Sequence, residues 1–171
     1  MVGNAHSPEL EKEEEVVAQL ERLGIRYLSR LAKSSIPKDH PPQKFIAEIV
    51  KQPSARVRNA VISLFLARPE YSAYIQEALK HTNTEAALTL KFFYTAAVLL
   101  QEKYEINPTT VLPDFFRAEI GVTGKNPDEK LHSLGQKHQQ VSGKSINWQG
   151  TYENAAKHLL HQWELEKAWN K

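Results

Sequence analysis

The feature that most constrains the fold is the helical spacing of apolar residues across 54–105. Apolar side chains recur there every three or four positions, and no stretch alternates between apolar and polar residues as a half-buried strand does. Arg68-Pro69 and the polar residues 81–84 divide the segment into three predicted helices. The last of them, 84–105, is apolar nearly all round, so it should form the buried centre of the fold with these side chains inside: Phe92, Phe93, Ala96, Leu99 and Leu100.

Shorter helical patterns, separated by proline and glycine, fill most of the remaining chain. Ser54 and the pair Asn126-Pro127 are typical of helix starts, and Gly121 and Gly143 of helix ends. We therefore predict an all-α fold of at least six helices, an irregular helical bundle of antiparallel helical hairpins with a short α-solenoid-like middle. In the shorter helices the same spacing turns further side chains inward: Tyr71, Tyr74, Ile75, Phe115, Phe116, Leu134, His138, Val141 and Tyr152.

The organisation of the chain is that of a single helical domain, 1–171. Its 171 residues, 41% hydrophobic and 25% charged, are typical of one globular unit. Residues 7–33 are predicted as an acidic N-terminal helix, 34–42 as a linker with three prolines, and 43–171 as the helical body. Gly24 is a point at which the first helix can kink or split. The linker is the best hinge candidate, because proline cannot continue a helix.

Composition excludes several classes of protein. The sequence has no cysteine, which rules out disulfides, thiolate metal sites and a cysteine nucleophile. No apolar run approaches the roughly 18 residues that a membrane-spanning helix needs. The N-terminus is acidic where a secretory signal is basic. We therefore expect a soluble, cytoplasmic protein without membrane contact.

No residues have the spacing of a catalytic, cofactor-binding or metal-binding motif. His158, His161 and Glu164 would share one face of a helix, but they lie on its polar side and form no His-Glu-x-x-His pattern. Asp114 and Glu119 would point about 140° apart around a helix, which does not suit an acid–base pair. The sequence thus predicts a protein that is not an enzyme and that uses no metal and no cofactor.

Charge is distributed unevenly along the chain. Residues 1–24 carry six acidic and two basic groups, whereas 25–100 carry eleven basic and five acidic groups, a net charge of +6. Clustered lysine and arginine attract polyanions, although a solvated surface has the same composition. If this region binds nucleic acid, these residues should make the contacts: Arg26, Arg30, Lys33, Lys38, Lys44, Lys51, Arg56 and Arg58.

Two resemblances bear on fold and function. Residues 51–70, KQPSARVRNAVISLFLARPE, resemble a HEAT repeat in their turn proline, their arginine and their Val-Arg-x-Ala-Val-x-x-Leu helix. Over 40–165 the chain resembles uncharacterised all-helical bacterial proteins that share the blocks at 64–70, 94–101 and 112–116. The second resemblance implies a role beside a nucleotidyltransferase-type partner, as an antitoxin or an accessory subunit.

These observations favour a non-catalytic, helical protein-binding module. It would be a regulatory or antitoxin-like partner of another bacterial protein, or would pair with itself as a homodimer. The apolar seam of the N-terminal helix can dock on its own domain or on another chain, and two tryptophans lie at the edges of the last helix. The predicted partner-binding residues are Val17, Leu20, Tyr27, Leu31, Trp148 and Trp169. Binding of nucleic acid through 25–100 is the alternative.

Overall fold

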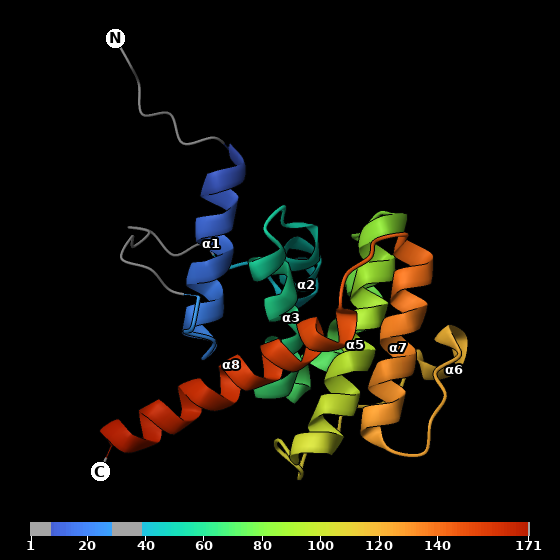
Figure 1. The fold of residues 1–171 in the computed structure, drawn as a ribbon. Coiled ribbons are helices and arrows are strands. Elements are labelled where there is room, and N and C mark those ends of the chain that lie inside the picture. The colour runs from blue at the N-terminus through green and yellow to red at the C-terminus, as the bar shows by residue number, and fades with distance from the viewer. Residues whose placement is uncertain (1–7, 29–38, 171) are drawn as a thin grey trace.

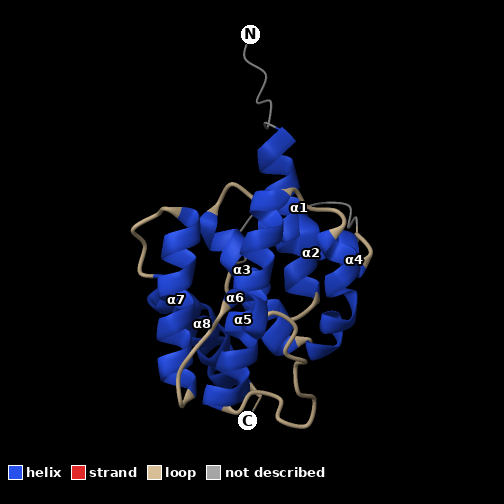
Figure 2. Cartoon of the chain, turned by 90° about the vertical axis from the view of Figure 1, so that its right-hand side faces the viewer, coloured by secondary structure: helices blue, strands red, loops and turns tan. Residues whose placement is uncertain are grey.

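A computed structural model of the chain describes residues 8–28 and 39–170. Within these ranges it contains eight α-helices and one 3-10 helix but no strand, so the predicted all-α fold is confirmed (Figure 2). None of the helices in the described ranges is long and apolar enough to cross a membrane. The hairpin and solenoid-like details stay predictions.

The helices differ widely in length and share one core. In chain order they are α1 (Pro8–Arg22), α2 (Pro42–Lys51), α3 (Ala55–Ala67), the 3-10 helix η1 (Pro69–Tyr74), α4 (Ile75–Leu79), α5 (Thr84–Tyr104), α6 (Arg117–Ile120), α7 (Pro127–Ser142) and α8 (Trp148–Trp169). Helices α3, α7 and α8 pack on α5, and α1 packs on α2 and α3. Helix α8 crosses the body, and its C-terminal end extends beyond the other helices (Figure 1).

Local signals set several helix ends where the sequence predicts them. Ser54 Oγ accepts a hydrogen bond from Val57 N–H at 3.4 Å and begins α3. Asn126 Oδ1 accepts one from Glu129 N–H at 2.9 Å and begins α7. Such side-chain acceptors satisfy backbone N–H groups that have no partner within the first turn.

Helix α5 is the centre of the hydrophobic core. The five α5 side chains predicted to be buried are each at most 2% exposed. The core is one cluster of apolar side chains that extends from Val16 and Leu20 of α1 to Leu159 of α8. Helix α1 therefore belongs to the same core as the rest of the body.

The N-terminal helix is shorter than predicted. Gly24, with φ of 101°, follows its last turn. Ile25 N–H donates to Leu20 O at 2.9 Å, and Gly24 N–H donates to Glu21 O at 3.1 Å. This paired arrangement ends a helix and needs a residue in the left-handed region, which glycine adopts without strain. The predicted 7–33 helix is therefore wrong over 23–28, where the described chain is not helical. Residues 29–38, its predicted end and most of the linker, lie outside the described ranges.

Three predicted side-chain orientations are also wrong, since Tyr74, Phe115 and Val141 are all exposed. Tyr74 lies in a 3-10 helix, whose three residues per turn do not follow the α-helical spacing on which the prediction rests. Phe115 precedes the four-residue α6 and is not in a helix at all. Val141 lies in the last turn of α7, where the helix end borders a cleft.

Candidate functional site

The predicted partner-binding seam of α1 is occupied by the chain itself. Leu20 is fully buried, and Val17 and Tyr27 are partly buried against the same core. The Tyr27 hydroxyl forms a 2.6 Å hydrogen bond with Ser63 Oγ of α3, and burial raises the pKa of Tyr27 to about 12. Leu31 lies outside the described residues. The seam therefore holds α1 on its own domain.

A buried glutamine fixes the turn after α1 on α8. Gln162 Oε1 accepts hydrogen bonds from the backbone N–H groups of Arg26 at 2.7 Å and Tyr27 at 3.1 Å, and Gln162 Nε2 donates to Gly24 O at 2.8 Å. The Arg26 guanidinium also pairs with Glu166. We name these five residues the α1–α8 junction. Sequence reasoning missed it, although Gln162 lies three residues after Leu159 and seven after Ala155, on the inner face of α8. A polar residue at such a position indicates a buried hydrogen-bonding partner.

The three described arginines of the predicted nucleic-acid set make contacts within the chain, and Lys51 Nζ lies 3.7 Å from Glu48 Oε1. Arg56 and Arg58 donate to backbone carbonyl oxygens, with N···O distances of 3.2 Å for the former and 2.8 and 3.0 Å for the latter. Arg26 belongs to the junction. Lys44 and Lys51 are exposed, and three further residues lie outside the described ranges: Arg30, Lys33 and Lys38. The described arginines thus help to hold the chain's own segments together.

In the part of the chain that the structure describes, no three His, Asp or Glu side chains are grouped so that they could hold a metal ion. The His158 ring packs against Tyr27 instead, with ring centroids 5.1 Å apart. His161 and Glu164 are exposed on the same helix. These three residues therefore give no metal site in the described structure.

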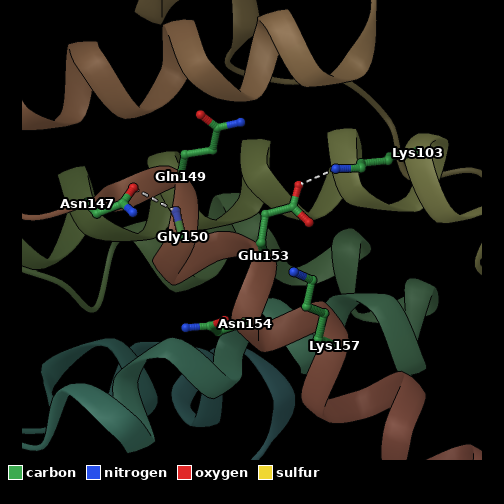
Figure 3. Close-up of a pocket in the computed structure, with 7 residues that line it drawn as sticks. All are labelled: Lys103, Asn147, Gln149, Gly150, Glu153, Asn154 and Lys157. Carbon is green, nitrogen blue, oxygen red and sulfur yellow. Dashed lines mark hydrogen bonds and ion pairs between the residues drawn. The ribbon is translucent and has the colours of Figure 1, made fainter.

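A shallow pocket of about 330 Å³, lined by polar side chains, lies between the C-terminal end of α5 and the first turns of α8 (Figure 3). Inside it, the buried Glu153 carboxylate accepts hydrogen bonds from Lys103 Nζ at 2.7 Å and from Tyr104 OH. Lys103 Nζ also lies 2.6 Å from Asp128 Oδ1 of α7. Desolvation opposes the charged form of Lys103, but the two carboxylates outweigh it and raise its pKa above the ordinary value. These ion pairs and hydrogen bonds join α5, α7 and α8.

A larger cleft, of about 720 Å³, lies where the ends of five helices meet. Its walls come from the C-terminal ends of α2 and α7 and from the N-terminal ends of α3, α5 and α8. Three cationic side chains and one carboxylate line it: Lys51, Arg58, Lys144 and Glu85. We name it the helix-end cleft.

One wall of the helix-end cleft is a stack of aromatic rings. The His138 ring, 3% exposed, lies between Phe92 and Trp148, with ring centroids 4.4 and 3.6 Å away and interplanar angles of 18° and 13°. Its Nδ1 lies 2.6 Å from Tyr152 OH. Burial, together with the charge of Lys144, lowers the pKa of His138 to about 3, so the ring is neutral at pH 7. Trp148, a predicted partner-binding residue, is thus part of a cleft wall and not of an open surface.

The end of α8 presents the most exposed large apolar side chain in the described ranges. Trp169 is 85% exposed, and Leu165, one turn earlier, is 49% exposed. Both border a shallow groove of about 350 Å³ on the part of α8 that extends beyond the body (Figure 1). We name Leu165 and Trp169 the α8 tip. Among the described members of the predicted partner-binding set, Trp169 is the one with an exposed side chain.

Comparisons of the chain with protein-family models, with curated proteins and with solved structures gave no match, so its function has to be inferred from its own residues.

Proposed function

We propose that the chain is a non-catalytic helical module that binds another protein through the α8 tip, as a regulatory or antitoxin-like partner. The exposure of Trp169 on a helix end that extends beyond the body supports this proposal (Figure 1). Tryptophan offers a large, rigid apolar surface with a polar N–H at its edge. It is also among the residues most enriched where single side chains dominate binding energy.

The α8 tip stands on a helix that is fixed at its base. Gln162 and Glu166 of the α1–α8 junction lie within two turns of Trp169 on the same helix. A surface held in place before binding loses less conformational entropy when a partner docks. The junction therefore supports a preorganised contact surface.

The buried titratable groups support a non-catalytic role. The Glu153 carboxylate already accepts two hydrogen bonds, and His138 is enclosed between two rings with its Nδ1 bonded to Tyr152. These contacts within the described chain account for the burial of both groups without a catalytic role.

Nucleic-acid binding has less support. Three of the described arginines in the predicted set are bonded to carbonyl oxygens or paired with a carboxylate. These contacts orient each guanidinium toward the chain itself and leave fewer of its five N–H groups for a phosphate. We therefore keep this function as an outcome of the test.

The test is a binding measurement on the full-length chain. The tagged chain is purified from its native cell, co-purifying proteins and nucleic acids are identified, and sedimentation velocity shows whether a second copy is the partner. We expect Trp169→Ala to weaken binding of the identified partner about 30-fold, which corresponds to a cost of about 2 kcal/mol.

Val111→Ala is the matched control, because Val111 is 73% exposed but lies in the loop between α5 and α6. We expect it to leave the affinity unchanged. Equal losses in the two variants, or recovery of nucleic acid with no protein partner and no self-association, would contradict the proposal.

A further inference from the structure

We infer that the helix-end cleft binds a small organic anion with an apolar body, such as an aryl carboxylate or an aryl phosphate. The inference concerns a different surface from the α8 tip and does not depend on it. Its volume of about 720 Å³ lies within the range of about 300–1,000 Å³ that is usual for small-molecule sites.

The charge of the lining favours an anion. Lys51, Arg58 and Lys144 come from three separate elements, and Glu85 is the carboxylate among the lining residues. The Lys144 ammonium makes no hydrogen bond or ion pair with any described residue. Lys51 forms a 3.7 Å ion pair with Glu48 at the surface. Arg58 uses Nη1 to bond to the carbonyl oxygens of Gln52 and Pro53, which leaves its other N–H groups for a ligand. Because a recessed site with apolar walls concentrates its field, this excess positive charge attracts anions into the cleft.

Apolar side chains in the same lining favour an apolar body. Phe93 and Trp148 line the cleft beside the neutral His138, and Val141 is 53% exposed at its edge. A ligand with an apolar body gains by covering Val141 and the exposed edges of these largely buried rings. An inorganic ion makes no such contact.

Two buried polar atoms in the lining residues have no partner. Trp148 is 9% exposed and Gln52 is 3% exposed. Within the described residues, Trp148 Nε1 has no hydrogen-bond acceptor and Gln52 Oε1 has no donor. Buried polar groups in native proteins are nearly always paired. The unpaired Trp148 N–H is a donor that an anionic ligand can satisfy, whereas Gln52 Oε1 needs a donor, such as water or a hydroxyl group.

The experiment is an NMR titration of the full-length chain with phenyl phosphate and with benzoate. The chain has three tryptophans, so its indole N–H signals separate Trp148 from Trp163 and Trp169, which do not line the cleft. We expect a saturable shift of the Trp148 signal alone. Benzyl alcohol and inorganic phosphate, which each lack half of the proposed chemistry, should bind at least about tenfold more weakly than the better aryl anion.

Two variants test the location. Lys144→Gln should weaken binding about tenfold, as expected when a charged hydrogen bond is lost. Val141→Trp should block the cleft from its exposed edge without disturbing the core. Lys137→Gln is the matched control, because Lys137 is exposed on α7 and does not line the cleft.

The inference is overturned if neither aryl anion saturates the Trp148 shift below about 10 mM, a weak limit for a specific site. It is also overturned if Lys144→Gln and Val141→Trp bind as the unmodified chain does. If inorganic phosphate binds as tightly as the better aryl anion, the claim that the ligand has an apolar body is wrong. If benzyl alcohol binds as tightly, the claim that the ligand is an anion is wrong.

Discussion

The core around α5 and the α1–α8 junction hold helices together by different means. In the core, apolar side chains from most of the helices surround Leu99, Leu100 and their neighbours. At the junction, one glutamine bonds to three backbone groups of a segment that is distant in sequence. Apolar contact is non-directional and tolerates small shifts, whereas hydrogen bonds weaken steeply as their geometry changes.

This difference predicts how the stability of each region responds to the loss of a side chain. Loss of a core side chain should lower the stability of the whole chain, because α5 contacts α2, α3, α7 and α8. Loss of the junction should release the turn after α1 first. Among the described helices α1 packs mainly on α2 and α3, and an element with fewer packed neighbours opens locally at a lower free energy than the global unfolding transition.

The same substitution at the centre of the core and at its edge, on the helix next to the junction, gives the largest expected effect. Leu99 of α5 and Leu20 of α1 are both fully buried. We expect Leu99→Ala to cost about 4 kcal/mol of unfolding free energy, and Leu20→Ala about 2 kcal/mol, because a peripheral helix can shift to fill the space. Chemical denaturation followed by circular dichroism measures both values. A larger cost for Leu20→Ala would reverse the proposed order of the two regions.

The buried, hydrogen-bonded pair of His138 and Tyr152 should make the stability of the chain depend on pH. The pKa of His138 falls from an ordinary 6.5 to about 3 on folding, so the unfolded chain binds more protons between these values. The stabilisation by neutral His138 is therefore full above pH 6.5 and is lost as the pH falls towards 3. Between pH 7 and pH 4 the loss should be about 3 kcal/mol.

His138→Gln removes this titration while keeping a side chain that can bond to Tyr152. The difference in stability between the unmodified chain and the variant should therefore shrink as the pH falls from 7 to 4. Denaturant titrations at several pH values measure it, and carboxylates that titrate in the same range cancel in the difference. A constant difference would mean that His138 titrates normally.

Gln162→Ala tests the junction directly. The substitution leaves Arg26 N–H, Tyr27 N–H and Gly24 O without their partner, which should cost about 2 kcal/mol. Amide exchange of Arg26 and Tyr27 should accelerate more than that of α5. Gln136→Ala on exposed α7 surface is the control and should cost less than about 0.5 kcal/mol. If exchange accelerates equally in α5, the junction is not an independent unit.

The sequence predicted those features that depend on neighbouring residues. The apolar spacing of α5 and the caps at Ser54 and Asn126 are local patterns, and all are confirmed. The role of Gln162 depends on Gly24, which lies 138 positions away. No local pattern shows which backbone groups will lie opposite a polar side chain.

The same difference between local and long-range features holds for the candidate sites. Trp169 was recognisable as a residue at the edge of its helix, and it is exposed. Trp148 was placed in the same group, but it lies in the helix-end cleft, whose walls come from five helix ends that the spacing of residues could not bring together. The sequence therefore predicted many of the buried apolar side chains, but it did not predict the helix-end cleft that some of them line together.

The smallest expected effect concerns the α8 tip, which contributes neither to the core around α5 nor to the α1–α8 junction. Trp169 is 85% exposed and lies beyond the junction residues Gln162 and Glu166. Trp169→Ala should therefore change the unfolding free energy by less than about 0.5 kcal/mol, as is usual for surface positions. Denaturation of the purified chain at two concentrations measures this value and detects any self-association. A stability loss that grows with protein concentration would identify a second copy as the partner, whereas a loss independent of concentration would show that the tip packs within the chain and is not a free binding surface.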